Sequence, residues 1–153
     1  MSATDSAHQL VALPTESVGS EPPRVRLVDV RAQLGPSVRY RVEVHLESPE
    51  GRPAVASHED AASATGDVRI AAEAAIKALR AAMPGAPPFY VAGAKTVRAF
   101  DQTVTLVLIG ITGEPGPARL LGAACNEENL ARAAVVAVLN ATNRVLGNYL
   151  ATR

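Results

Sequence analysis

The chain has 153 residues, of which 48% are hydrophobic and 20% are charged, and this balance excludes a wholly disordered polypeptide. Lys and Arg together number 15, as do Asp and Glu, so there is no net charge to attract nucleic acid or an anionic membrane. Aromatic residues make up only 3% of the chain, which leaves almost no side chains on which bases could stack. We therefore expect a small globular protein whose partners include neither nucleic acid nor a membrane.

The N-terminal segment differs in composition from the rest of the chain. Residues 1–23 are rich in Ser, Thr, Glu and Pro, contain no Lys or Arg, and end in Pro22-Pro23. This composition predicts a disordered or mobile tail, followed by a single domain over residues 24–153. The tail lacks the basic and apolar regions of a signal peptide, and the longest apolar run, Val104 to Ile111, is too short to span a bilayer. We therefore expect a cytoplasmic protein, and the scarcity of Lys beside abundant Ala, Gly and Pro suggests a bacterial origin.

The single cysteine, Cys125, excludes an intramolecular disulfide and a cysteine-based metal cluster. It ends the apolar run Leu120 to Cys125, so we expect a buried and unreactive thiol.

The first part of the domain has the pattern of three β-strands. Val25 to Leu34 is rich in β-formers and has a phase slip at Leu27-Val28, which predicts a β-bulge. After a turn at Gly35-Pro36-Ser37, residues 38–46 alternate strictly between apolar and polar, so one face of that strand should pack in a core. A second turn at residues 48–51 leads to a shorter strand over Arg52 to His58.

A helix follows these strands, and the second half of the chain repeats the plan. Asp67 is a suitable N-cap for the helix, and Met83-Pro84-Gly85 ends it. Strands are then predicted over residues 89–100, 103–112 and 118–125, and a second helix opens at Asn126. When Ile70 is placed on Leu130, three alanines also coincide: Ala71, Ala74 and Ala81 fall on Ala131, Ala134 and Ala141. The order predicts an α+β fold of two βββα units (24–85 and 86–153), with antiparallel sheets each covered by an Ala-rich helix.

The strand from Val104 to Ile111 is apolar on both faces, which is typical of a central strand covered on two sides. One cover is the domain's own helix, and the other is the second sheet or another subunit. We therefore expect a homodimer, with Val107, Ile109 and Ile111 at its interface.

Two groups of residues are candidates for ligand binding. The predicted helix starts, at Gly66, Asp67 and Asn126, offer free N–H groups to an anion, unless the neighbouring acidic side chains already cap the helices. Arg39 and Arg41 project from the polar face of their strand and could bind a carboxylate or phosphate. The alternative for these arginines is pairing across strands with acidic residues, for which Asp29, Glu43 and Glu47 are available.

Catalytic and cofactor motifs are absent from the sequence. It contains no Walker loop, GxGxxG, GxSxG, HExxH or CxxC pattern. His45 and His58 could hold a metal ion with nearby carboxylates (Glu43, Glu59 or Asp60), but histidines on neighbouring strands are more often solvated. We therefore predict no catalytic residue, no metal and no cofactor.

The doubled βββα pattern resembles the C-terminal regulatory domain of 2-isopropylmalate synthase. The resemblance covers about residues 24 to 148, and it rests on the Ala-rich helices, on Gly66-Asp67-Val68 and on the run from Val138 to Arg144. It implies dimerisation and binding of leucine near the helix starts, although the catalytic barrel of that enzyme is absent and its glycine-rich loop is only partly present.

These observations lead to one prediction of function and one alternative. The prediction is a non-catalytic regulatory or assembly module that self-associates and binds a small metabolite or a protein partner. The alternative is a small enzyme whose active site is assembled at a subunit interface from scattered Arg, His, Asp and Glu side chains.

Overall fold

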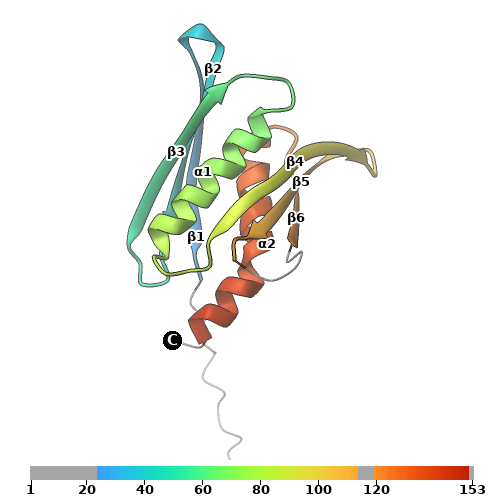
Figure 1. The fold of residues 1–153 in the computed structure, drawn as a ribbon. Coiled ribbons are helices and arrows are strands. Elements are labelled where there is room, and N and C mark those ends of the chain that lie inside the picture. Colours follow the sequence, from blue (N-terminus) through green and yellow to red (C-terminus); the bar gives the residue numbers. More distant parts are fainter. Residues whose placement is uncertain (1–23, 114–118, 152–153) are drawn as a thin grey trace, which may run out of the picture.

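The computed structural model describes residues 24–113 and 119–151, which form two βββα units in succession (Figure 1). The first unit consists of β1 (Arg26–Gly35), β2 (Arg39–Glu47), β3 (Pro53–Ala61) and α1 (Asp67–Ala82). The second consists of β4 (Phe89–Ala99), β5 (Gln102–Ile111), β6 (Arg119–Cys125) and α2 (Leu130–Ala151). The predicted α+β architecture is confirmed, whereas the predicted tail, residues 1–23, lies outside the described residues.

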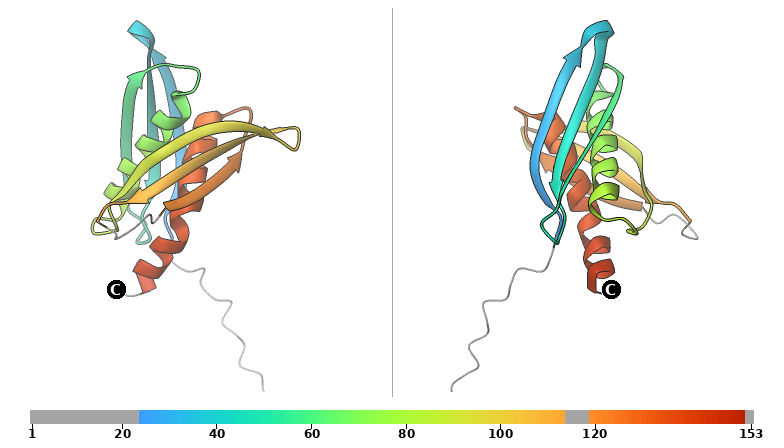
Figure 2. Two further views of the ribbon diagram at one scale, coloured as in Figure 1. Left: turned by 45° about the vertical axis from the view of Figure 1, so that its right-hand side comes forward. Right: turned by 90° about the vertical axis from the view of Figure 1, so that its left-hand side faces the viewer.

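The two helices lie between two antiparallel sheets, sheet A (β1-β2-β3) and sheet B (β4-β5-β6) (Figures 1 and 2). Helix α1 packs on β2 and β3 and also reaches β4, while α2 packs on β5 and β6 and touches β1. The helices also contact each other, so the two units share one core. Each sheet therefore has an inner face toward the helices and an outer face away from them.

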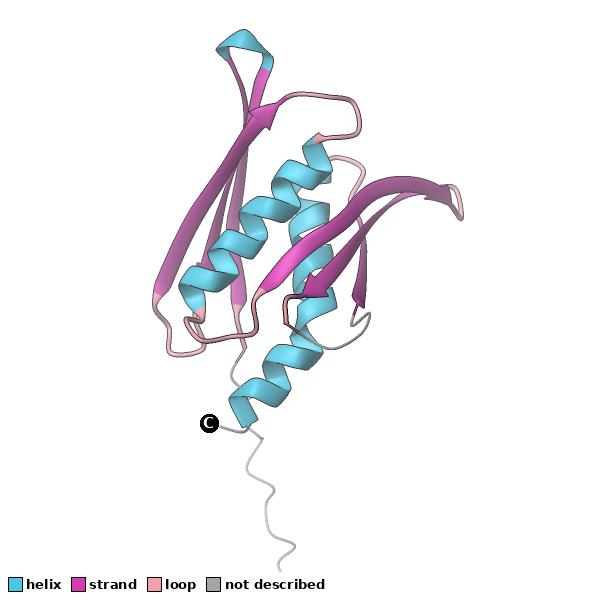
Figure 3. Cartoon of the chain, in the orientation of Figure 1, coloured by secondary structure: helices cyan, strands magenta, loops and turns pink. Residues whose placement is uncertain are grey.

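Alternation in β2 shows how the sequence specifies sheet A. Val42, Val44 and Leu46 are almost completely buried against α1, while the residues between them lie on the outer face. The predicted bulge in β1 is confirmed, because the register shifts between Leu27 and Asp29. The short 3-10 turn at Pro36–Val38, at the tip of the β1–β2 hairpin, confirms the predicted turn (Figure 3).

Helix α1 is alanine-rich because it is surrounded on most sides. Sheet A, β4 and α2 all contact it, and its alanines at 71, 72, 74, 75 and 78 are fully buried. Small side chains allow these neighbours to approach closely, which maintains the packing density of the core.

Helix α2 approaches sheet B even more closely at Gly122 in β6. A Cβ atom at this position would overlap the backbone carbonyl of Ala137 and crowd the side chain of Ala141. Only glycine allows the helix backbone this near to the strand.

The start of α2 differs from the prediction. The helix begins at Leu130 rather than at Asn126, and the side chain of Asn129 caps it by accepting the N–H of Arg132 at 2.9 Å. Asn126 accepts the N–H of Asn129 at 3.0 Å and thus stabilises the preceding turn. Both asparagines are suited to capping, and the shorter helix places Glu127 outside the first turn.

Candidate functional site

The outer face of sheet A is polar. The strand register places Arg39, Arg41, Glu43, His45 and Glu47 of β2 on this face, together with the following residues of β1 and β3: Asp29, Arg31, Gln33, Val55, Ser57 and Glu59. Most of the charged groups are paired, since Arg31 lies 2.9 Å from Asp29, Arg39 lies 2.6 Å from Glu59 and Arg26 lies 3.4 Å from Glu47. Exposed pairs of this kind contribute little to stability but keep the face well solvated.

The outer face of sheet B is apolar. The register places the following residues on it: Tyr90, Gly93, Lys95 and Val97 of β4; Val104, Leu106, Leu108 and Gly110 of β5; Arg119, Leu121, Ala123 and Cys125 of β6. We call these residues the apolar face. Leu121 is 66% exposed and Tyr90 is 46% exposed, and the only charged groups are the cations of Lys95 and Arg119. An exposed contiguous surface of this composition is typical of an interaction site.

A hollow of about 340 Å³ lies in the middle of the apolar face, lined by Gly93, Lys95, Leu106, Leu108 and Leu121, with Ala94 at its base. It exists because the register of β4 shifts between Val91 and Gly93, and because Gly93 contributes no side chain. The hollow therefore extends from Gly93 of β4 across β5 to Leu121 of β6, which forms one wall and is 66% exposed.

The predicted interface residues lie on the opposite side of β5. Val107 and Ile109 are 0% exposed and face α2, and Ile111 packs partly buried against the same core. A partner therefore cannot contact Val107 or Ile109. The residues of β5 that a partner can reach lie on the outer face: Val104, Leu106 and Leu108. Because both faces of this strand are apolar, periodicity alone did not distinguish them, and the prediction chose the inner one.

The thiol of Cys125 is exposed at the end of β6, contrary to the prediction of a buried cysteine. The apolar run that it ends is a strand whose residues alternate between α2 and the outer face, and Cys125 falls on the outer face.

The predicted helix-start residues are engaged in local turns. The carboxylate of Asp67 accepts the N–H of Ser63 at 3.4 Å, and Gly66 precedes α1 as its N-cap without a side-chain bond. Asn126 lies in the turn before α2 rather than at the helix start. Burial, followed by the charge of Asp67, raises the pKa of Tyr40 near the start of α1. The side chains of Asp67 and Asn126 thus stabilise the turns that precede the helices, and the prediction that Asp67 is the N-cap of α1 is wrong.

Glu127 provides a pH-dependent contact between the loop before α2 and the start of β5. Its carboxylate accepts the N–H of Thr103 at 2.6 Å and lies 3.2 Å from Arg98. The Thr103 bonds, followed by the charge of Arg98, hold the pKa of Glu127 below its usual 4.5. Since the folded pKa is lowered, the contribution to stability is present above the unfolded pKa and is lost as pH falls through the folded pKa.

We therefore expect Glu127→Gln to lower the melting temperature at pH 7, and the difference from wild type to shrink as pH falls through the folded pKa of Glu127. Thermal unfolding followed by circular dichroism across this range measures the effect, with Glu128→Gln as the control in the same loop. A Glu127→Gln difference that is constant with pH would contradict this assignment.

Arg39 and Arg41, the other predicted binding residues, have different surroundings on sheet A. Arg39 pairs with Glu59, which is not among the acidic residues predicted as its partners. Arg41 has no ion pair among the described residues and borders a hollow of about 170 Å³, together with Arg31, Gln33 and Glu43. Asp29 is engaged by Arg31, whose hydrogen bond lowers the pKa of this carboxyl group.

The two histidines of sheet A cannot share a metal ion. His45 lies on the outer face, 2.6 Å from Glu43, whereas His58 lies on the inner face and contacts Lys77 at 2.9 Å. No group of three or more potential ligands (His, Cys, Asp or Glu) is close enough to hold a metal within residues 24–113 and 119–151.

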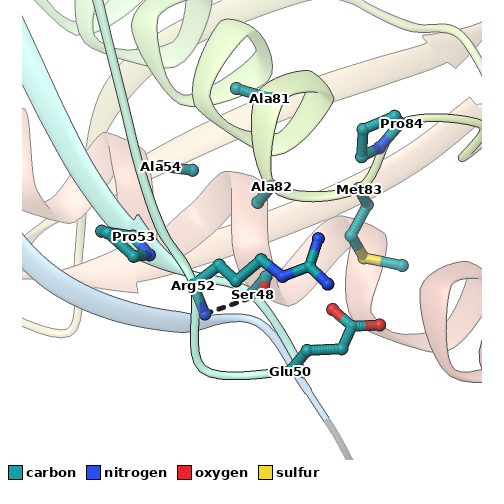
Figure 4. A pocket seen from close by; sticks show the side chains of 9 residues that line it. All are labelled: Ser48, Glu50, Arg52, Pro53, Ala54, Ala81, Ala82, Met83 and Pro84. Carbon is teal, nitrogen blue, oxygen red and sulfur yellow. Dashed lines mark hydrogen bonds between the residues drawn. The ribbon is translucent and has the colours of Figure 1, made fainter.

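A cavity of about 370 Å³ lies between the β2–β3 turn and the C-terminal end of α1 (Figure 4). The buried Ser48 hydroxyl accepts the N–H of Arg52 at 3.1 Å, and the side chains of Arg52 and Glu50 point toward the same space below Met83. Arg52 and Glu50 place opposite charges side by side, so the net charge of the cavity favours neither an anion nor a cation.

Two comparisons with known proteins, one with protein-family models and one with curated proteins, found no match for this chain. Of the helices in the described part of the chain, neither is long and apolar enough to cross a membrane.

Proposed function

We propose that this chain is a non-catalytic assembly module that associates with a second copy of itself through the apolar face. The observation that carries the proposal is the contrast between the two outer sheet faces. Sheet A presents paired charges to water, whereas sheet B presents leucine, valine and tyrosine side chains with no acidic group among them. Removing such a surface from water stabilises an assembly by about 25 cal/mol per Å² of apolar area.

A second copy fits this face because the face carries both halves of a complementary contact. Leu121 forms an exposed wall of the hollow on β6, and Gly93 leaves the opposite side of the hollow, over β4, without a side chain. A two-fold pair brings the same surface of each copy together, so a face with a projection and a depression can complement itself.

The size of the apolar face sets the expected affinity. Three strands spaced about 4.8 Å apart, with roughly seven residues along each, give an area of only a few hundred Å². A standard interface buries about 800 Å² per partner, so we expect a dissociation constant of roughly 10–100 µM. Association of this strength depends on the protein concentration. A small metabolite or protein partner that binds the dimer more tightly than the monomer would shift the equilibrium toward the dimer.

This proposal agrees with the resemblance to the regulatory domain of 2-isopropylmalate synthase, which implies dimerisation, and we propose that the chain is a module of that kind. The enzyme alternative would use a pair such as His45 and Glu43, which lies on the solvated outer face of sheet A. In the single chain this face is open, so the enzyme alternative requires a second subunit to enclose the pair.

Sedimentation equilibrium from about 5 to 500 µM tests the proposal. The wild-type mass should rise above 15.9 kDa with concentration, and Leu121→Lys should remain monomeric because it adds a third cation to a face whose charges are already positive. The matched control is Val55→Lys, since Val55 is 50% exposed on the outer face of sheet A. A wild-type mass that stays at 15.9 kDa throughout would refute the proposal.

A further inference from the structure

We propose that the two copies pair about a two-fold axis parallel to β5, so that Leu121 of each copy enters the hollow over Gly93 of the other. This arrangement rests on the proposed function, because it specifies how the apolar face recognises a second copy. It follows from the order of side chains across the sheet.

Leu121, Leu108 and Gly93 form one row across sheet B, since Leu108 is in register with Leu121 on one side and with Gly93 on the other. A two-fold axis along β5 exchanges the positions of β4 and β6. The partner's Leu121 then lies over Gly93, while Leu108 meets the partner's Leu108. Face-to-face sheets pack about 10 Å apart, a gap that interdigitating leucine side chains fill.

The neighbouring rows match under the same axis. In one of them, Lys95 and Ala123 flank Leu106, so the long Lys95 side chain lies opposite the small Ala123 of the partner. In the other row, Tyr90 and Arg119 flank Gly110, and the Tyr90 ring covers the space where a Cβ of Gly110 would be. The guanidinium of the partner's Arg119 then lies opposite this ring. Stacking of a cation on an aromatic face is stabilising.

The other in-plane axis, which runs across the strands through the same row, gives a poorer fit. It places Leu121 against Leu121 and leaves the two Gly93 hollows facing each other as a void. Unfilled space between packed surfaces loses dispersion contacts. Sheet twist rotates aligned sheets by about 30°, which is small enough to preserve the contacts near the centre of the face.

A size swap tests the arrangement. Gly93→Leu fills the hollow, and Leu121→Ala removes the projection, so each variant should weaken association by at least about tenfold, because the two-fold axis repeats the loss. The double variant moves the projection to β4 and the hollow to β6, and it should recover an affinity close to that of wild type. A Cβ at position 93 has its nearest neighbour, the Leu108 Cβ, at 4.0 Å, and the hollow provides the space into which the rest of a leucine side chain extends.

Sedimentation equilibrium on the four proteins measures these affinities, and melting temperatures at about 1 µM, below the association range, confirm that the variants fold. Recovery of affinity in the double variant supports the arrangement. Gly93→Leu that associates as well as wild type, or a double variant weaker than both singles, would overturn it. Either result would overturn the arrangement alone, provided that the wild type associates and Leu121→Lys does not. A wild type that is monomeric at all concentrations would refute both the arrangement and the proposed self-association.

Discussion

Replacing Gly122 by alanine is expected to destabilise the protein by at least about 2–3 kcal/mol, although only one methyl group is added. The new Cβ would overlap the carbonyl oxygen of Ala137, which belongs to the helix backbone and cannot rotate away. Helix α2 would have to move off β6, and the packing of the helix on this strand would be lost. Urea unfolding followed by circular dichroism measures the loss as a lower midpoint with little change in slope.

Gly93→Ala is the matched control, because Gly93 lies in the same sheet on the outer face with space for a Cβ. Neither glycine has a positive φ, so the backbone contributes equally little in the two variants. Gly93→Ala should be as stable as wild type. If Gly122→Ala unfolds at the same urea concentration as this control, the close approach of α2 to β6 is not present in solution.

Val107→Asp and Ile109→Asp are each expected to cost several kcal/mol and to leave a largely unfolded protein at 37 °C. Both side chains are 0% exposed between β5 and α2, and a carboxylate there would lose its hydration. Differential scanning calorimetry provides the measurement, and variants as stable as the parent would show that this side of β5 faces water.

Leu108→Asp is the control for these two variants, because it introduces the same carboxylate on the other side of the same strand. Leu108 points away from α2 onto the apolar face and is only partly buried in the single chain. At about 1 µM, below the association range, this variant should melt within a few degrees of wild type. At higher concentration it should fail to associate, because a carboxylate would lie at the centre of the paired faces.

Local sequence patterns were sufficient for most secondary elements. The alternation of residues 38–46 predicted the buried side of β2, and the phase slip at Leu27-Val28 predicted the bulge. These features depend on side-chain spacing and on the restricted φ of turn residues, which act over a few positions. The start of α2 was predicted too early because Asn126 and Asn129 are both good caps. The N–H of Thr103, on a strand distant in the sequence, donates to Glu127 and holds the turn between the two asparagines.

The sequence by itself therefore determined two βββα units with Ala-rich helices and a strand, Val104 to Ile111, that is apolar on both faces. Only the tertiary structure decided which side of β5 faces α2, since Val107 and Leu108 are equally apolar and the choice depends on which rows of sheet B the helix covers. The apolar face, its hollow at Gly93 and the projection of Leu121 follow from that choice and from the register of three strands. Registers and helix positions arise from contacts between residues far apart in the chain, and no local pattern contains them.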